Sequence, residues 1–512
     1  MSAKAKNAAT KGRNQPAQGR TLSDAARGYA SQSSSSPEGA KEDGDLPEGW
    51  TRLTLGEVGR WFGGGTPSKA NPRFWTGGNI PWVSPKDMKF DVVTDAQDHI
   101  TEDAVAQSAT NLVEAGSVLI VVRSGILQHT LPVAVASRPV ALNQDLKAIK
   151  PLRNINSDYL ALALKAFEQD ILHTCTKTGT TVQSLEMPIF LRFQIPVAPV
   201  AEQQRIVAEI GKQFTRLEAG VAALRRVQAN LKRYRAAVLK AACEGRLVPT
   251  EASLARSRPP SKNGQPAYES GEALLTRILT ERRQNWQGRG KYKEPARPET
   301  QGLPHLPEGW TWASPEQLSA AEPHSLAIGP FGSNLKVCDY TDFGVPLVFV
   351  RNIRLSRFGG EGAVFVSNAK AAELRAHSVS GGDLLITKMG DPPGDACSYP
   401  DGQPDAVITA DCIKLRLSPL LPQRQYFVHS INSQVVKSQL QLITKGVAQM
   451  KLSLGRFSTI AIPLPPLREQ ARILAKLEQR LSVVEGLESV VLANLQRVTR
   501  LRQSILQKAF TV

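Results

Sequence analysis

Apolar residues in two distant segments of the chain recur every seven positions, and this period predicts two long helices. The two sets of positions are related by an offset of 267 residues: Ile210, Leu217, Leu224, Leu231 and Val238 in the first segment, and Leu477, Val484, Val491, Val498 and Ile505 in the second. A heptad of apolar residues keeps one seam of a helix facing a partner helix. We therefore expect the two helices to pair within the chain. A whole domain lies between them, so we expect an antiparallel pair with one globular domain at each end.

The segments around these helices are duplicated as well. The string "IPVAPVAEQQRIV" at Ile195 returns as "IPLPPLREQARIL" at Ile462 with the same offset of 267 residues, and "LPEGW" at Leu46–Trp50 returns at Leu306–Trp310. Solenoid units repeat at about 20–50 residues, so this period is too long for a solenoid. The chain is predicted to hold two copies of a domain, each followed by a long helix.

Both copies of the domain show the pattern of a mixed fold. Short apolar runs such as Val118–Val122 and Val133–Ala136 alternate with glycine-rich turns, which predicts short strands joined by loops. A helix is predicted over Asp158–Thr174, and "VPLVFV" and "DLLIT" are strand-like runs of the second copy. The predicted fold class is α/β (α+β), with two mixed α/β domains separated by a pair of long antiparallel coiled-coil helices.

Composition divides the rest of the chain. The first 45 residues are rich in Ala, Ser, Gly and Lys, which predicts a disordered basic tail. The predicted segments are this tail (1–45), a first mixed domain (46–199), a first spacer helix (200–248), a linker (249–305) with a short helix (271–286), a second mixed domain (306–465) and a second spacer helix (466–512).

The net charge points to a polyanionic partner. The chain has 512 residues and a formal charge of +17, so nucleic acid is the first candidate and an anionic membrane surface the second. No apolar run reaches the 18 or more residues of a membrane span, and the N-terminus lacks the apolar stretch of a secretory signal. Five scattered cysteines without a C-x-x-C pair fit reduced thiols. We expect a cytoplasmic protein with no membrane partner.

Catalytic motifs are incomplete wherever they begin. "DPPG" at Asp391–Gly394 resembles part of an amino-group methyltransferase motif but has glycine where an aromatic residue must stack on the flipped base. "DMK" at Asp87–Lys89 has no acidic partner for a metal-dependent nuclease, no phosphate-binding loop is present, and seven scattered histidines form no metal-ligand set. The sequence predicts a binding protein with no catalytic residues, no metal site and no cofactor of its own.

Eight glycine-flanked loops, four in each domain, mix cations, hydroxyls and amides. Arg, Asn and Gln can read bases, and Lys, Ser and Thr can hold phosphates. On this chemistry we predict the following DNA-binding residues: Thr66, Ser68, Lys69, Arg73, Lys86, Arg123, Ser124, Lys177, Thr180 and Gln183 in the first domain, and Ser333, Asn334, Lys336, Arg351, Asn352, Arg354, Lys388, Lys445, Gln449 and Lys451 in the second.

Several of these strings together resemble the specificity subunits of type I restriction–modification systems, over nearly the whole chain from residue 46 to residue 512. The duplicated "IPVAPVAEQQRIV" and "IPLPPLREQARIL" are the most specific. The weaker matches are "GGTPS" (Gly64–Ser68), "IPW" (Ile80–Trp82), "TGTT" (Thr178–Thr181), "AACEGRLV" (Ala241–Val248), "YKEP" (Tyr292–Pro295) and "GPFGSNL" (Gly329–Leu335).

The resemblance implies two target-recognition domains, each reading one half of a bipartite site in double-stranded DNA. It further implies that the helices set the gap and dock two adenine-N6 methyltransferase subunits, and that restriction/translocase subunits complete the enzyme. S-adenosylmethionine, ATP and Mg would then bind those partners. The basic tail and most of the linker have no place in the family pattern, and no base contact can be transferred residue by residue.

Three alternatives stay open at this point. The chain could be the recognition subunit of a type IIB-like nuclease–methylase, which differs in having one partner with both activities. It could also be a stand-alone DNA-modifying enzyme, which would bind S-adenosylmethionine or cut DNA with Mg by itself. A coiled-coil scaffold with nonspecific basic charge would bind DNA with strong salt dependence and no sequence preference.

Overall fold

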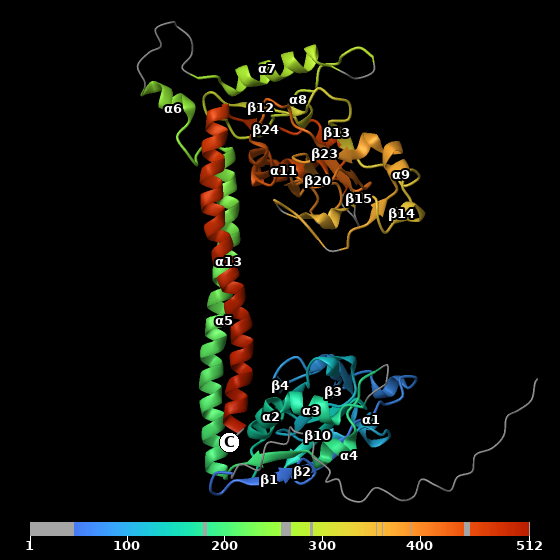
Figure 1. Cartoon of the computed structure of the whole chain (residues 1–512). Coiled ribbons are helices and arrows are strands. Elements are labelled where there is room, and N and C mark those ends of the chain that lie inside the picture. The colour runs from blue at the N-terminus through green and yellow to red at the C-terminus, as the bar shows by residue number, and fades with distance from the viewer. Residues whose placement is uncertain are drawn as a thin grey trace, which may run out of the picture. The chain divides into compact units, whose positions relative to one another are not determined.

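The computed structural model describes residues 46–177, 182–257, 268–286, 290–354, 356–360, 362–390, 392–444 and 451–510 (Figure 1). The predicted tail (1–45) lies outside the described residues. The chain divides into two compact units, one formed by residues up to Val207 together with Leu506–Val512, and the other by Ala208–Ile505. Helices and sheets occur in both units, which confirms the mixed fold class.

The first unit contains two mixed sheets. The larger one has the strand order β2 (Gly59–Gly63), β10 (Leu146–Pro151), β7 (Val118–Val121), β8 (Val133–Ala136) and β4 (Val92–Val93). The other has the order β5 (Asp98–Ile100), β3 (Ile80–Val83), β9 (Val140–Leu142) and β6 (Leu112–Val113). Strands β3 and β9 pair in parallel, whereas β7 pairs antiparallel with both of its neighbours. All four residues of β7 are buried, as expected for a central strand.

Short helices accompany these sheets. They are α1 (Glu102–Ala106), α2 (Ser157–Ala166), α3 (Glu168–Cys175) and α4 (Met187–Arg192), with 3-10 turns η1 (Pro72–Phe74), η2 (Pro85–Asp87) and η3 (Gly125–Gln128). The helix predicted over Asp158–Thr174 is therefore two helices, and that prediction was wrong in its continuity. The backbone of Phe167 ends α2 and begins α3, and its ring packs on Phe193, with the ring centroids 6.0 Å apart.

The second unit repeats the central strand order of both sheets and differs at their edges. One sheet has the order β13 (Leu326–Ile328), β23 (Cys412–Leu415), β20 (Leu384–Thr387) and β21 (Ala396–Ser398). The other has the order β14 (Tyr340–Thr341), β18 (Phe365–Val366), β15 (Val345–Val348), β22 (Ala406–Ile408) and β19 (Ser378–Val379), and β16 (Ile353–Arg354) pairs with β17 (Arg357–Phe358). As with β3 and β9 in the first unit, β15 and β22 form a parallel pair.

The linker takes part in the second unit. It contributes α6 (Glu251–Arg256) and α7 (Gly271–Gln284), and the domain adds α8 (Pro315–Leu318), α9 (Asn368–Glu373), α10 (Arg424–Ile431), α11 (Gln434–Ile443) and α12 (Leu454–Phe457), with 3-10 turns η4 (Val337–Asp339), η5 (Val350–Asn352) and η6 (Arg375–His377). The side chain of Ser270 caps α7, and Leu274 and Ile278 enter the hydrophobic core of the second domain. The short helix predicted in the linker is thus part of a packed core.

Two 44-residue helices, α5 (Val200–Cys243) and α13 (Leu467–Phe510), lie side by side (Figure 1). Leu231 packs with Val484 and Val491, and Leu224 and Leu495 border the same cluster. Contacts on α5 move toward its N-terminus as those on α13 move toward its C-terminus, since Arg235 pairs with Glu488 whereas Arg502 lies over the ring of Phe214. The pair is antiparallel, as predicted. The first helix ends at Cys243 and not at residue 248, because Gly245 turns the backbone with a φ of 65°.

The seam positions differ in their burial along the pair. The buried ones are Ile210, Leu231, Val238, Leu477, Val484 and Val491, and the half-buried ones are Leu217, Leu224, Val498 and Ile505. Val238 and Leu477 pack into the core of the second domain, so that end of the seam holds domain and helices together.

Each domain is joined to the helices by the same set of contacts. Strand β1 (Thr51–Thr54) pairs with β11 (Gln194–Val197), and β12 (Thr311–Ala313) pairs with β24 (Ile462–Leu464). Three side-chain hydrogen bonds recur in both copies: Trp50 Nε1 to Glu202 (3.0 Å) and Trp310 Nε1 to Glu469 (3.0 Å), Tyr159 OH to Pro196 O (3.0 Å) and Tyr426 OH to Pro463 O (3.1 Å), and Gln203 Nε2 to Ala198 O (2.8 Å) and Gln470 Nε2 to Pro465 O (2.8 Å). We call this duplicated set the frame.

Candidate nucleic-acid interface

The four predicted loops of the first domain meet at the carboxyl ends of β3, β7 and β9. Backbone hydrogen bonds tie them together: Gly65 N to Leu142 O (2.8 Å), Asn143 N to Val83 O (2.9 Å), Val122 N to Asp145 O (2.8 Å) and Ser124 N to Gln183 O (2.9 Å). Polar side chains from distant parts of the sequence are thereby placed on one surface. Such loops on a rigid sheet scaffold are where binding residues concentrate.

Most of the predicted side chains on this surface are open to solvent. Of the described ones, Ser124 and Gln183 are half-buried and the other seven are exposed: Thr66, Ser68, Lys69, Arg73, Lys86, Arg123 and Lys177. Thr180 lies outside the described residues. Lys86 pairs with Asp98 (2.9 Å) and Arg123 with Asp145 (2.6 Å). Exposed ion pairs contribute only about 0–1 kcal/mol, so a phosphate group can compete for these cations.

The second domain forms the same arrangement with different residues. Its loops meet at the carboxyl ends of β15, β20 and β22 through Gly329 N to Cys412 O (3.0 Å), Thr409 N to Val348 O (2.9 Å), Lys388 N to Asp411 O (2.8 Å) and Leu452 N to Lys388 O (2.9 Å). Ser333, Asn334, Lys336, Arg351, Arg354 and Lys451 are exposed, and Asn352 and Lys388 are half-buried. Lys445 and Gln449 lie outside the described residues, as does Asp391.

One predicted reader in the second domain has its polar atoms engaged by the backbone. Asn352 accepts a hydrogen bond from the amide of Phe349 (2.9 Å) and donates one to the carbonyl of Gly359 (3.2 Å). A base contact by this amide would have to use its second hydrogen and second lone pair, or displace these bonds. Arg351 lies at the surface, where it donates to the carbonyl of Gly362 (3.1 Å) and its guanidinium is 4.2 Å from the ring centroid of Phe349.

A glycine holds the first loop of each domain against the turn that follows the parallel strand pair. A Cβ atom on Gly64 would clash with the backbone oxygen of Asn143, and one on Gly329 with the backbone oxygen of Thr409. Only glycine permits so close a backbone approach. The "GGTPS" and "GPFGSNL" strings therefore have the same structural reason in both domains.

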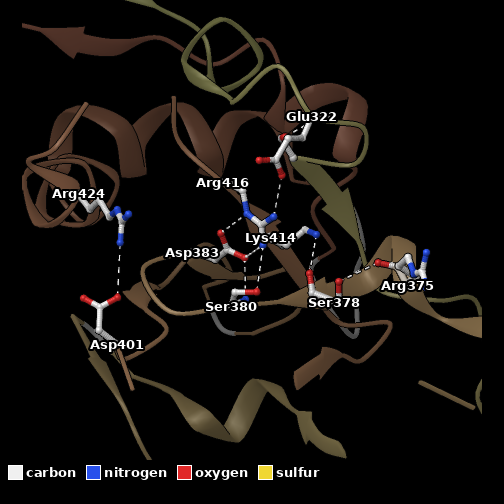
Figure 2. Close-up of polar contacts among 10 residues, drawn as sticks. Glu322, Arg375, Ser378, Ser380, Asp383, Asp401, Lys414, Arg416 and Arg424 are labelled. Atoms are coloured by element: carbon white, nitrogen blue, oxygen red, sulfur yellow. Dashed lines mark hydrogen bonds and ion pairs between the residues drawn. The ribbon is translucent and has the colours of Figure 1, made fainter. Parts of the chain in front are cut away.

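A polar network occupies the opposite end of β23 in the second domain (Figure 2). Arg416 binds both carboxylate oxygens of Asp383 (2.8 Å each) and one oxygen of Glu322 (2.8 Å). Burial lowers the pKa of the neighbouring Lys414 to about 8, and its ammonium donates to the carbonyl of Ser378 (2.6 Å). The adjacent cavity of about 630 Å³ is lined by cations that already have carboxylate partners. This network stabilises the domain.

The described residues hold no clustered metal ligands, and four of their cysteines are buried. Across the described ranges, no group of three His, Cys, Asp or Glu residues is arranged to hold a metal ion. Burial raises the pKa of Cys175 and Cys243 to about 11 and that of Cys397 and Cys412 to about 12, which keeps these four thiols protonated and unreactive. In the part of the chain that the structure describes, no helix has both the length and the apolar character of a membrane span.

A family profile decides the classification. The profile described as "Type I restriction modification DNA specificity domain" matches residues 47–223 and 397–489, more than half of the chain. The chain belongs to this family. One matched stretch covers the first domain and the first half of α5, and the other covers the end of the second domain and the first half of α13, so the match reaches both copies.

Relatives of the type I specificity family agree with this result. The chain is 48% identical over 159 residues to the EcoR124I/EcoR124II specificity subunit of Escherichia coli, which is 31% of this chain and 39% of that relative. It is 29% identical to the MjaIX specificity subunit of Methanocaldococcus jannaschii over 32% of this chain and 37% of the relative, and 24% identical to the EcoBI specificity subunit of Escherichia coli over 73% and 69%. The first two alignments thus span little more than a third of those relatives.

A solved structure supports the fold. A chain from a type I R-M system has a TM-score of 0.62 and 17% identity, covering 91% of this chain and 98% of that chain. At this identity the likeness concerns the fold alone.

Some residues of the interface could not be found from sequence. The turn Asn143–Asp145 lies between the predicted loops, and Gln144 accepts from the hydroxyl of Thr66. The only signal in the sequence was a short polar string directly after an apolar run. Strand pairing brings this turn to the loops, and the pairing is not encoded locally.

Proposed function

We propose that this chain is the DNA-sequence-recognition subunit of a type I restriction enzyme and adenine-N6 methyltransferase complex. Each domain reads one half of a bipartite site in double-stranded DNA, and the helix pair sets the gap between the halves. The observation that carries the proposal is the matched arrangement of loops at the carboxyl ends of equivalent strands in both domains of a family member. The two sets of loops have a similar backbone arrangement but different side chains. This is expected of two domains that read different half-sites.

The helix pair offers a surface for the methyltransferase subunits. On α13, Val483, Leu487 and Val490 are 59%, 47% and 56% exposed, and their spacing places them on one face. On α5, Val227 and Tyr234 are 42% and 44% exposed, and each follows a seam residue by three positions, as Leu487 does on α13. Exposed apolar stripes at helical spacing favour docking of an amphipathic partner helix. Two such stripes support two methyltransferase subunits, with restriction/translocase subunits completing the enzyme.

The proposal assigns cofactors to the partners. S-adenosylmethionine belongs to the methyltransferase subunits, and ATP and Mg to the restriction subunits, so this chain supplies recognition and performs no catalysis itself.

Methylome sequencing tests the proposal. Cells that express this chain with the methyltransferase subunit of the same system should acquire adenine methylation at one split site, and cells with the methyltransferase subunit alone should not. Exchanging residues 46–199 for the corresponding domain of another family member should change one half of the methylated site and leave the other half unchanged. Methylation without any split motif, or failure of the two proteins to form a complex, would overturn the proposal.

A further inference from the structure

A groove of about 660 Å³ lies where the helix pair meets the second domain, within the second unit. Its lining includes Lys232 and Arg235 of α5, Glu485 and Glu488 of α13, and Arg357 of β17. Arg235 pairs with Glu488 (3.1 Å), and Arg357 pairs with Glu485. The two acids are therefore matched by two cations, whereas Lys232 has no ion-pair partner among the described residues.

The unmatched positive charge continues along α5. No acidic residue stands between Glu218 and Glu244, whereas six cations do: Arg225, Arg226, Lys232, Arg233, Arg235 and Lys240. Arg225 precedes Lys232 by seven residues, so it lies on the same side of the helix, about 10 Å away along the axis. It is exposed and has no ion-pair partner among the described residues.

The facing part of α13 does not neutralise this side. Ser489 and Leu492 line the groove, and the residues seven positions further, Gln496 and Thr499, are uncharged. At 100° per residue, the apolar stripe around Val483 and Leu487 lies on the opposite side of α13 from the groove. A partner helix on that stripe would leave the groove side open.

We propose that this groove side of the helix pair, with Arg225 and Lys232 as its free cations, binds the phosphate backbone of the DNA between the two half-sites. The inference rests on the proposed function and adds to it, since the helix pair would hold the gap DNA as well as set its length. Phosphates occur about every 3.4 Å along each strand, so cations about 10 Å apart can contact the same backbone. Such contacts carry no sequence information and add affinity to every site.

The test compares two double variants with equal charge. Arg225→Gln with Lys232→Gln removes the two groove cations, and Arg226→Gln with Arg233→Gln removes two exposed cations, also seven residues apart, from another side of α5. Binding of the assembled complex to a duplex with its bipartite site is measured by fluorescence anisotropy at several salt concentrations. We expect the groove variant to bind on the order of tenfold more weakly, with a salt slope lower by about two, and the control to bind like wild type. Thermal unfolding confirms that both variants are folded.

A second duplex links the effect to the gap. Neutral methylphosphonates replace the phosphates between the half-sites, and wild type should lose about as much affinity as the groove variant loses on normal DNA, whereas the groove variant should be insensitive. Equal losses in both double variants, or wild-type binding that ignores the methylphosphonates, would overturn the inference while leaving half-site recognition intact. If wild type does not prefer its split site over a scrambled duplex, the proposed function and this inference both fall.

Discussion

In the first domain, Trp50 donates its indole hydrogen to Glu202, whose side chain is 33% exposed and lies near Arg205 (3.6 Å). In the second domain, Trp310 makes the same bond to Glu469, which is fully buried and also accepts from the amide of Glu251 (2.9 Å). The frame contact is identical, but the linker covers it in the second copy alone. Burial raises the pKa of Glu469. Duplication thus preserved the hydrogen bonds that fix domain to helix, while the surroundings of those bonds diverged.

The surfaces of the two halves diverged much further than the frame. The loops of both domains start from equivalent backbone hydrogen bonds. The loop with Thr66, Ser68 and Lys69 nevertheless corresponds, in the second copy, to a loop with the phenylalanine Phe331, which is 72% exposed. Buried contacts constrain each other through packing and hydrogen bonding, whereas exposed loop side chains are constrained only by what they bind. A protein with one frame and two reading surfaces follows from this difference.

The largest expected effect is a difference in stability between variants on the buried side and variants on the exposed side of α13. Val484 is 1% exposed in the seam, and its neighbour Val483 is 59% exposed. Val484→Glu places a carboxylate in an apolar cluster and should destabilise the protein by about 3–5 kcal/mol in urea unfolding. Val483→Glu is the matched control and should unfold like wild type but bind the methyltransferase subunit more weakly. Equal free energies of unfolding for the two variants would contradict the packing of Val484 in the seam.

A buried histidine gives the second half a pH dependence at a position where the first half has leucine. His429 occupies the position of Leu162 in the first copy, and burial lowers the pKa of His429 to about 4, with Arg235 adding to the effect. The unfolded chain takes up this proton near pH 6.5 and the folded chain only near pH 4, so stability is lost as pH falls between these values, by up to about 3 kcal/mol.

His429→Leu makes the second copy resemble the first. Its free energy of unfolding, measured in urea, should depend less steeply on pH between pH 6.5 and pH 4 than that of wild type. Above pH 6.5, the free energies of unfolding of the two proteins should change with pH to a similar extent. Parallel curves across the acidic range would show that His429 does not titrate as its burial implies.

The Trp–Glu hydrogen bond of the frame should contribute more to stability in the second domain, where the linker covers it. Glu469→Leu leaves Trp310 Nε1 and the amide of Glu251 without an acceptor in a buried site and should cost about 1–3 kcal/mol. Glu202→Leu should cost less, because water can reach the half-exposed site near Trp50. Unfolding free energies of both variants check this order, and the reverse order would remove the argument that the linker sets the difference.

The smallest effects concern the reading loops. Lys69→Ala and Lys336→Ala should each lower the salt slope of DNA binding by about one, and each should weaken binding with no change in unfolding, since both side chains are exposed. The comparison between domains is sharpened by duplexes that keep only one half-site. Lys69→Ala should lower the affinity for the first half-site, and Lys336→Ala should lower the affinity for the second. Wild-type affinity of both variants on both half-sites would exclude these loops from the DNA interface.

Predictions from the sequence succeeded where a local pattern carries the physical cause. The heptad of Leu224, Leu231 and their partners encodes a helix seam in its period, and Gly64 and Gly329 mark loops whose backbones approach another strand. Predictions stopped at features that depend on contacts between distant segments. The break at Phe167, the packing of α6 against Glu469 and the turn at Asn143–Asp145 each follow from a neighbour more than 25 residues away. Whether the predicted loop residues touch DNA stays a prediction.

The sequence by itself determined the duplication, the two helices and their apolar seam, and the mixed character of both domains, because periodicity and repeated strings are properties of the chain read in order. The tertiary structure decided which loops share a surface, which Trp–Glu bond is covered, and on which side of the helix pair the free cations lie. Strand pairing and helix packing bring together residues hundreds of positions apart. The charge and burial of a side chain depend on these neighbouring residues.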